Sequence, residues 1–301
     1  MAYSGIGGQA VMEGVMMKNQ DTYAVAVRKP DQEIIVEKNS YHGLCKNETI
    51  KNIPLIRGVI NFIDSMVLGM STLTFSASFY EEEETEKPKS EKREKAEMGI
   101  TIFISIIMAV GIFMILPFYV SLLFQKVTDS QTLIILMEGI LRIAIFIGYI
   151  LLISQVKDIK RVFMYHGAEH KCINCIEHGL ELNVENVRKS SREHKRCGTS
   201  FLFFVVIISI VATLFIRVDS RILRLVLRLA IIPFIAGISY EIIRLAGRSD
   251  HPLVTILSKP GMWLQRLTTK EPDDDMIEVG IASVEAVFDW REYIANLEQK
   301  E

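Results

Sequence analysis

The residues best suited to chemistry lie together in one polar stretch, residues 157–200, between two apolar segments. This stretch holds four of the six histidines and three of the four cysteines of the chain. In YHGAEHK, His166 and His170 are four residues apart, and the later HKRCGTS supplies His194 and Cys197. Side chains at positions i and i+4 lie on one face of a helix, about 5–6 Å apart between Cβ atoms, so two imidazoles there can share one ion. The spacing therefore predicts a metal site.

One interpretation makes this site catalytic. Residues 166–170, HGAEH, fit the H-x-x-E-H pattern of a zinc protease family. The two histidines would hold zinc, and Glu169 would take a proton from the metal-bound water. A third ligand, His194 or Cys197, would leave one coordination position open, where zinc lowers the pKa of water to about 7. Gly167 weakens the helix that this geometry needs, by about 1 kcal/mol.

A second interpretation makes the zinc structural. Cys172 and Cys175 form one C-x-x-C pair, and His194 and Cys197 form a second pair, with 18 residues between the two pairs. Four such ligands would close the coordination sphere. Two further alternatives stay open. In one, Cys175 and Cys197 change state reversibly in a metal or redox sensor; in the other, the histidines and cysteines are ordinary surface and core residues.

The composition predicts a membrane protein. The chain has 301 residues, of which 50% are hydrophobic, and a mean hydropathy of +0.27. A transmembrane helix needs about 20 apolar residues. Four segments reach about this length: residues 99–124, 132–154, 199–216 and 222–246. We expect an α-helical integral membrane protein with about four transmembrane helices, and a partly buried or interfacial apolar helix over 54–80 rather than a fifth span.

The distribution of basic residues predicts which side each loop faces. Residues 157–200 carry nine Lys and Arg, whereas the loop 125–131 carries only Lys126. Since basic loops stay in the cytoplasm and no cleavable signal is visible, the N terminus, the insert and the C terminus are expected to be cytoplasmic. Four arginines oppose this topology at the outer turn of the second hairpin, where they either bind lipid phosphate or pair internally: Arg217, Arg221, Arg224 and Arg228.

The remaining segments have distinct predicted roles. Alternation over 23–28 and 33–37 predicts strands in the N-terminal region, and the charge run 81–98 predicts a flexible tether. After EPDDD, the apolar residues Ile277 and Ile281 continue a helical spacing, which predicts an amphipathic helix packed on the N-terminal strands. The expected divisions of the chain are 1–53 (cytoplasmic and β-rich), 54–80, 81–98, 99–155 (transmembrane hairpin), 156–198 (cytoplasmic His/Cys insert), 199–246 (transmembrane hairpin) and 247–301 (cytoplasmic tail).

Charge and cysteine usage limit the partners. The net charge is −2 and no basic-aromatic surface is apparent, so we expect membrane lipids and no nucleic acid as partners. Cysteines on the cytoplasmic side stay reduced, so we expect no disulfide framework. Within the predicted spans, Glu138 and Arg142 are four residues apart and are expected to pair, and intramembrane ionisable residues are candidates for function.

Four motifs, in order along the chain, resemble a family of bacterial membrane proteins: GGQAVMEGVMMK, YHGAEHK, HKRCGTSF and LTTKEPDDDMIEV. These are the YqhQ-like proteins, domain-of-unknown-function family 1385, and the resemblance covers essentially the entire chain. It implies a metal-dependent enzyme in a bacterial cytoplasmic membrane, without a substrate. The family motifs fall on Gln9, Glu13, His166, Glu169, His170, His194 and Cys197, with Cys175 in the adjoining segment.

Cys172 lies outside the family motif, which favours a site built from the two helical histidines and the His194–Cys197 pair over the closed four-ligand site. Glu13 either reaches the site as a ligand or base, or is a strand-edge carboxylate without a role there.

The leading hypothesis is a zinc-dependent hydrolase at the cytoplasmic face, acting on a peptide, a lipid or a lipid-linked metabolite. The alternative is a non-enzymatic scaffold or transporter with a structural zinc.

Overall fold

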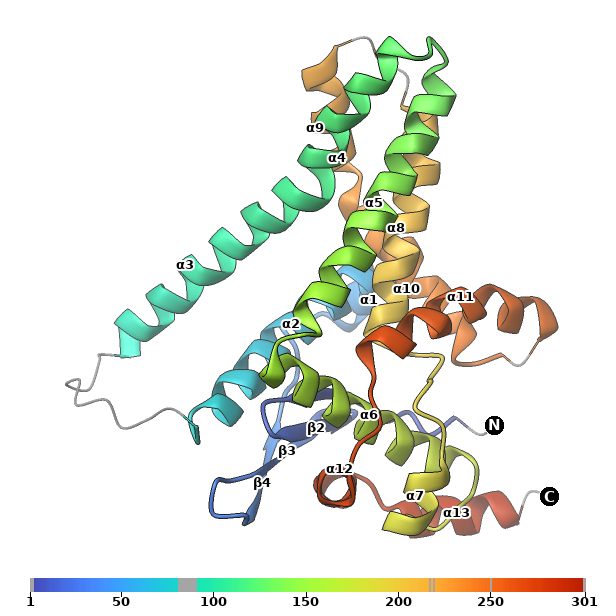
Figure 1. Cartoon of the computed structure of the whole chain (residues 1–301). Helices are drawn as coiled ribbons and strands as arrows, with labels where there is room; N and C mark the ends of the chain where they lie inside the picture. Colours follow the sequence, from blue (N-terminus) through green and yellow to red (C-terminus); the bar gives the residue numbers. More distant parts are fainter. Residues whose placement is uncertain (1–2, 81–90, 217, 219, 250, 300–301) are drawn as a thin grey trace. The chain divides into compact units, whose positions relative to one another are not determined.

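The computed structural model describes residues 3–80, 91–216, 218, 220–249 and 251–299. By their contacts these residues form two compact units (Figure 1). The first comprises Met1–Tyr80, Leu151–Val205 and Pro233–Glu301, and the second comprises Glu81–Ile150 and Val206–Ile232. All the predicted metal ligands belong to the first unit.

An antiparallel sheet organises the first unit. Four strands follow one another in the described part of this unit and pair with their sequence neighbours in the order β1-β2-β3-β4. Their bounds are β1 Gly7–Val11, β2 Gly14–Asn19, β3 Thr22–Arg28 and β4 Ile34–Ser40. Within β2 and β3 the residues opposite one another include Val15 with Ala26 and Met17 with Ala24. The predicted strands over 23–28 and 33–37 are therefore confirmed, and two further strands precede them.

Helices cover both faces of this sheet. Val15 and Met17 face a core shared with α6 Lys157–Glu177 and α12 Asp274–Val287. Met16 and Val25, which point to the opposite face because side chains alternate along a strand, pack instead with Leu68 of α2 Ile56–Ala77. The central strands β2 and β3 are thus buried on both sides over most of their length.

The helix that follows the EPDDD segment forms as its sequence predicts. Asp273 is the N-cap of α12, and its carboxylate accepts a hydrogen bond from the backbone N–H of Met276 at 2.9 Å. The apolar face of α12 lies on β2, β3 and α6, and Ser283 donates a hydrogen bond to the carbonyl of Ala24 at 3.1 Å. Packing of this helix on the N-terminal strands is confirmed.

The other helices of the first unit are short or lie outside the sheet layers. They are α1 Glu48–Asn52, α7 Val184–Lys189, α11 Pro252–Thr268 and α13 Trp290–Glu298, with most of α10 Ile232–Ala246 and the first turns of α8 Gly198–Phe215. The Arg57 guanidinium of α2 pairs with the carboxylate of Glu241 in α10. Phe62 of α2 stacks on Phe201 of α8, with ring centroids 5.2 Å apart.

Helices make up the described part of the second unit. They are α3 Glu91–Val110, a π-helical turn Gly111–Ile115, α4 Leu116–Ser121, a 3-10 turn Leu122–Lys126, α5 Gln131–Ile153 as far as Ile150, the end of α8, and α9 Arg221–Ala230. The π turn ends two residues before Pro117, whose ring would clash with the carbonyl four residues earlier in a regular helix. Pro233 accounts in the same way for the break between α9 and α10.

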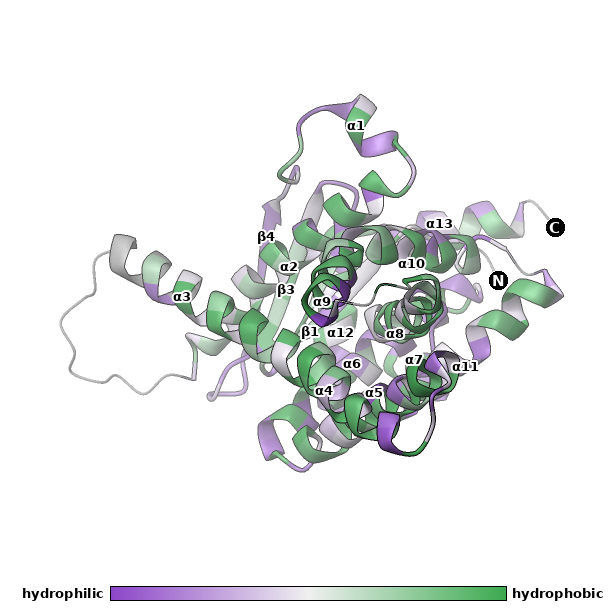
Figure 2. Ribbon diagram, turned by 90° about the horizontal axis from the view of Figure 1, so that it is seen from above, coloured by the Kyte–Doolittle hydropathy of each residue, from purple (hydrophilic) through white to green (hydrophobic). Residues whose placement is uncertain are grey.

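Five helices among the described residues are long and apolar enough by composition to cross a membrane: the four predicted spans and Ile56–Ala77, where we expected a partly buried or interfacial helix. Figure 2 shows the apolar character of α8 and α10. The prediction for residues 81–98 is corrected in part. Of the predicted tether 81–98, residues 81–90 lie outside the described residues, whereas 91–98 are helical and continue into α3. Glu, Lys, Arg and Ala are strong helix formers, so a charged composition did not preclude a helix there.

Candidate metal centre

Helix α6 carries two of the predicted ligands and lies directly against the segment that follows α11. A Cβ added at Gly167 would overlap the carbonyl oxygen of Lys270, because the two atoms would be much closer than 3.0 Å, the shortest separation that Cβ atoms normally show. The backbone N–H of Lys270 donates a hydrogen bond to the carbonyl of Phe163 at 2.8 Å. Gly167 therefore costs helix propensity but permits this close approach of two backbones.

Three predicted ligands converge at this point. The three ligand atoms are one nitrogen of His166, one nitrogen of His170 and the sulfur of Cys197, and they lie within 4.8 Å of one another. Among the described residues, this is the one group of three or more His, Cys, Asp or Glu side chains that could hold a metal ion. The Sγ of Cys197 is 3.3 Å from the Nε2 of His166. In a tetrahedral zinc site, bond lengths of about 2.0–2.3 Å place neighbouring ligand atoms about 3.3–3.8 Å apart. The three atoms thus lie at separations that one ion could bridge.

Backbone carbonyls hold both imidazoles in the orientation that metal binding requires. The Nδ1 of His166 is 2.9 Å from the carbonyl oxygen of Thr268, and the Nδ1 of His170 is 2.6 Å from that of Arg192. A carbonyl oxygen can only accept, so both Nδ1 atoms carry a proton, and Nε2 is the nitrogen of each ring that is left to bind a metal ion. Such outer partners are typical of histidines that bind metals.

The electrostatics favour the metal-binding form of Cys197. Burial raises the pKa of the Cys197 thiol, but the nearby His166 and His170 outweigh it and bring the pKa well below its usual value. The backbone N–H of Thr199 donates a hydrogen bond to the sulfur at 3.4 Å. Burial likewise lowers the pKa of His166, and the charge of Cys197 outweighs it and raises that pKa. The thiolate, which is the ligand form of cysteine, is therefore the stable one here.

Glu169 lies beside the three ligand atoms and is buried. Its Oε2 is 3.8 Å from the Nε2 of His166. Its side chain fits against Gly8 of β1, where an added Cβ would be 2.8 Å from the Cγ of Glu169. Burial raises the pKa of Glu169, although the charges of His170 and His166 oppose the shift. A carboxyl with a raised pKa beside a candidate metal site is suited to exchange protons.

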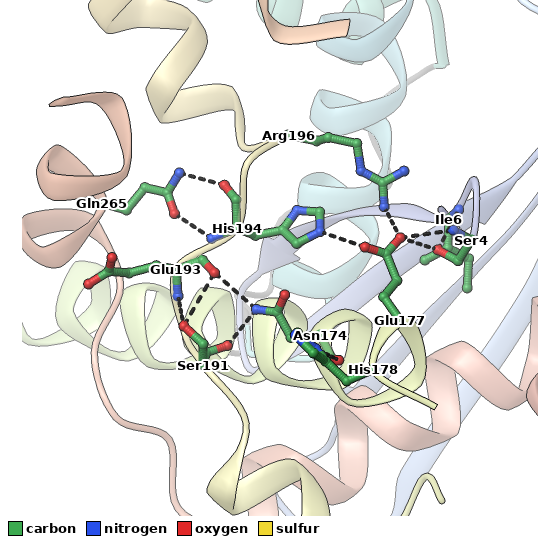
Figure 3. A network of polar contacts seen from close by, with 10 residues as sticks. All are labelled: Ser4, Ile6, Asn174, Glu177, His178, Ser191, Glu193, His194, Arg196 and Gln265. Carbon is green, nitrogen blue, oxygen red and sulfur yellow. Dashed lines mark hydrogen bonds and ion pairs between the residues drawn. The ribbon is translucent and has the colours of Figure 1, made fainter. Parts of the chain in front are cut away.

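The structure gives His194 a different partner (Figure 3). Its Nε2 lies 3.3 Å from the Oε2 of Glu177, and its backbone N–H and carbonyl both bond to the side-chain amide of Gln265. Glu177 also accepts from Ser4 and Arg196. Burial raises the pKa of Glu177, but the bond to His194 and the charge of Arg196 outweigh it and lower the pKa to about 2. Of the pair left open by the sequence, only Cys197 joins the two helical histidines.

Cys172 and Cys175 also lie away from the cluster. Both are fully buried in the core that α6 shares with the sheet and α12. A Cβ at Gly280 of α12 would be 2.9 Å from the Sγ of Cys172, and the thiol of Cys175 lies 3.4 Å from the carbonyl of Glu181. Burial raises the pKa of both thiols. The structure therefore does not assemble the closed four-ligand site.

Glu13 and Gln9 are placed elsewhere in the first unit. Glu13 pairs with Arg161 and accepts a hydrogen bond from the hydroxyl of Tyr165 at 3.2 Å. The side chain of Gln9 packs against Gly69 of α2. The carbonyls of Thr268 and Arg192 were not foreseen as partners of the histidines, because any residue type can supply a carbonyl and only the fold brings it into place.

Comparison with known proteins identifies the family but no reaction. The family model described as "Protein of unknown function (DUF1385)" matches residues 53–290. The uncharacterized protein YqhQ of Bacillus subtilis (strain 168) is 37% identical over 286 residues, which cover 92% of this chain and 90% of that protein. No solved structure matches the chain. With a family match over more than half of its length and a relative aligned over nearly all of it, the chain belongs to the DUF1385 family.

Proposed function

We propose that the protein is a zinc-dependent hydrolase of the bacterial cytoplasmic membrane, with His166, His170 and Cys197 as the metal ligands and Glu169 as the general base. The observation that carries the proposal is the pair of backbone carbonyls on the histidine Nδ1 atoms. They leave both Nε2 atoms as the nitrogens that could bind a metal ion beside the thiolate, an arrangement that a packed core does not require. The donor set of two imidazoles and one thiolate suits zinc.

Three protein ligands leave a position for water in a tetrahedral site. Zinc bound there would lower the pKa of a water molecule to about 7 and polarise a substrate carbonyl or phosphoryl group. Glu169, whose Oε2 is 3.8 Å from the Nε2 of His166, would accept the proton of that water and deliver it to the leaving group. The side chain of His166, which is 16% exposed, lies at the more open side of this otherwise buried cluster.

The five apolar helices and the basic residues of the insert support a membrane location with the site and both termini on the cytoplasmic side. A substrate there would be a peptide, a lipid or a lipid-linked metabolite.

The burial of the cluster favours one rival. His170 and Glu169 are 1% and 5% exposed. If the Glu169 carboxylate were a fourth ligand, the zinc would be a structural clasp in a scaffold or transporter, and its removal would unfold the insert.

The two functions are separable without a substrate. The full chain is purified in detergent and loaded with Co²⁺, which reports thiolate ligation and coordination number by its absorption spectrum. His166→Ala and Cys197→Ser should lose the bound ion, whereas Cys45→Ser, a thiol outside the insert, should retain it. Glu169→Gln should also retain it, and added azide should change the spectrum of the wild-type protein by entering the open position.

Loss of the ion in Glu169→Gln, with no response to azide in the wild type, would establish the structural clasp instead. Absence of Co²⁺ and Zn²⁺ binding in the wild type would refute both functions. His194→Ala is a further control, because its imidazole is held by Glu177 and should not be needed for the ion.

A further inference from the structure

Three buried charges meet inside the second unit. Glu138 of α5 accepts hydrogen bonds from Arg142 at 2.5 Å and from Arg228 of α9 at 2.7 and 2.9 Å. The three residues are 2%, 6% and 3% exposed, respectively. The hydroxyl of Ser121 also donates to Glu138, at 3.3 Å. The predicted Glu138–Arg142 pair is thus present, and a second arginine has joined it.

The cluster carries an excess positive charge. One carboxylate faces two guanidinium groups, and the remaining contact of Arg142 is to the neutral hydroxyl of Ser209 at 3.3 Å. The Nε atoms of Arg142 and Arg228 are buried without any hydrogen-bond partner within the described residues. A buried charge without a counter-charge is strongly unfavourable in an apolar environment. The arrangement therefore calls for an anion.

A small cavity opens beside these groups. Its volume is about 20 Å³, and Glu138, Arg224 and Arg228 are its charged lining residues. About 10–15 Å³ of such space holds one water-sized atom, so the cavity accepts a single ligand atom at a time. Gln125 and Gln131, at the ends of the two helices of the hairpin, also line it. Arg224 donates from Nε and one terminal nitrogen to the carbonyl of Val218, and within the described residues its other terminal nitrogen makes no hydrogen bond.

We propose that this cavity binds a phosphate group, one oxygen of which enters between Arg224 and Arg228. A guanidinium N–H makes a charge-assisted hydrogen bond to a phosphate oxygen, and the amides of the two glutamines supply further neutral donors. The bound anion balances the extra charge of Arg228. The source of the phosphate is either a phospholipid headgroup or free inorganic phosphate. This proposal is independent of the hydrolase, because it uses residues of the second unit alone.

The test measures lipid and phosphate binding to the delipidated full chain in detergent. Native mass spectrometry with dioleoylphosphatidylglycerol is compared with dioleoylglycerol, which has the same acyl chains and no phosphate. Calorimetry with inorganic phosphate forms the second arm. We expect one tightly bound phosphatidylglycerol or one phosphate, and the arm that responds identifies the source.

Variants assign the binding to the cavity. Arg224→Gln and Arg228→Gln should each weaken binding about 10- to 100-fold, the effect of losing a charged hydrogen bond. Arg221→Gln removes an exposed charge of the same helix outside the cavity and should leave binding unchanged. Glu138→Gln removes the competing carboxylate and should tighten phosphate binding. General destabilisation of the protein would weaken binding instead, so this variant separates the two effects.

The proposal is overturned if dioleoylglycerol binds as well as phosphatidylglycerol and inorganic phosphate does not bind. It is also overturned if Arg224→Gln binds as the wild type does, or if Arg221→Gln weakens binding as much as Arg228→Gln.

Discussion

Replacement of Gly167 by alanine separates what the helix prefers from what the tertiary structure requires. Alanine stabilises the interior of a helix by about 1 kcal/mol relative to glycine. In this fold, however, the added methyl group would overlap the carbonyl oxygen of Lys270. This is a backbone atom, so it cannot rotate away as a side chain could.

The magnitude follows from three opposing contributions. Forcing a methyl group into a packed contact costs about 1–3 kcal/mol, and losing the hydrogen bond from Lys270 to Phe163 costs about 1 kcal/mol. The gain in helix propensity offsets about 1 kcal/mol. We therefore expect Gly167→Ala to be destabilised by about 1–3 kcal/mol. Displacement of the same segment would also move the Thr268 carbonyl from His166, and loss of such a partner weakens metal binding about 10- to 100-fold.

The assay is unfolding of the full chain in detergent, followed by circular dichroism, together with a Co²⁺ titration. Gly148→Ala is the matched control, since Gly148 lies inside α5 with no atom within 4 Å of an added Cβ. That control should be stabilised and should bind the ion normally. If Gly167→Ala were as stable as Gly148→Ala and bound Co²⁺ equally well, the close approach of the two backbones would be refuted.

Three further predictions test the first unit. The pKa of Glu177 is lowered from 4.5 to about 2, so its charge stabilises the fold above pH 4.5, and this contribution is lost as the pH falls toward 2. Glu177→Gln should therefore lower the free energy of unfolding by about 3 kcal/mol at neutral pH. When unfolding is measured as a function of pH, the difference in this free energy between variant and wild type should shrink below pH 4.5. Asp273→Ala removes the cap on the N–H of Met276 and should lower the free energy of unfolding by about 1 kcal/mol, measured by urea unfolding. Trp263 is 57% exposed on α11, whereas Trp290 is 6% exposed. In a Trp290→Phe variant, Trp263 is the remaining fluorophore, and in vesicles with brominated acyl chains its fluorescence should be quenched. Unquenched emission would place this face of α11 outside the lipid.

The strands and helix α12 were predictable because their local patterns agree with their tertiary surroundings. The alternation over 23–28 and the Asp273 cap each act within a few residues, so the sequence alone located β3 and α12. The helical spacing of His166 and His170 likewise placed both imidazoles on one face of α6. The start of α3 at Glu91 was missed, because a charge run is compatible both with a tether and with a helix that continues into an apolar segment.

The sequence by itself determined the candidate metal-binding residues, the apolar helices and the strands, since each depends on residue type and on spacing along one element. It left open whether His194 or Cys197 joins the two helical histidines and whether Cys172 belongs to the site. Only the tertiary structure decided these points, because Glu177 and Gln265 hold His194, and Cys172 packs against α12. The carbonyls of Thr268 and Arg192 belong to the same category: they orient the imidazoles across 102 and 22 residues of chain, a separation at which local sequence carries no information.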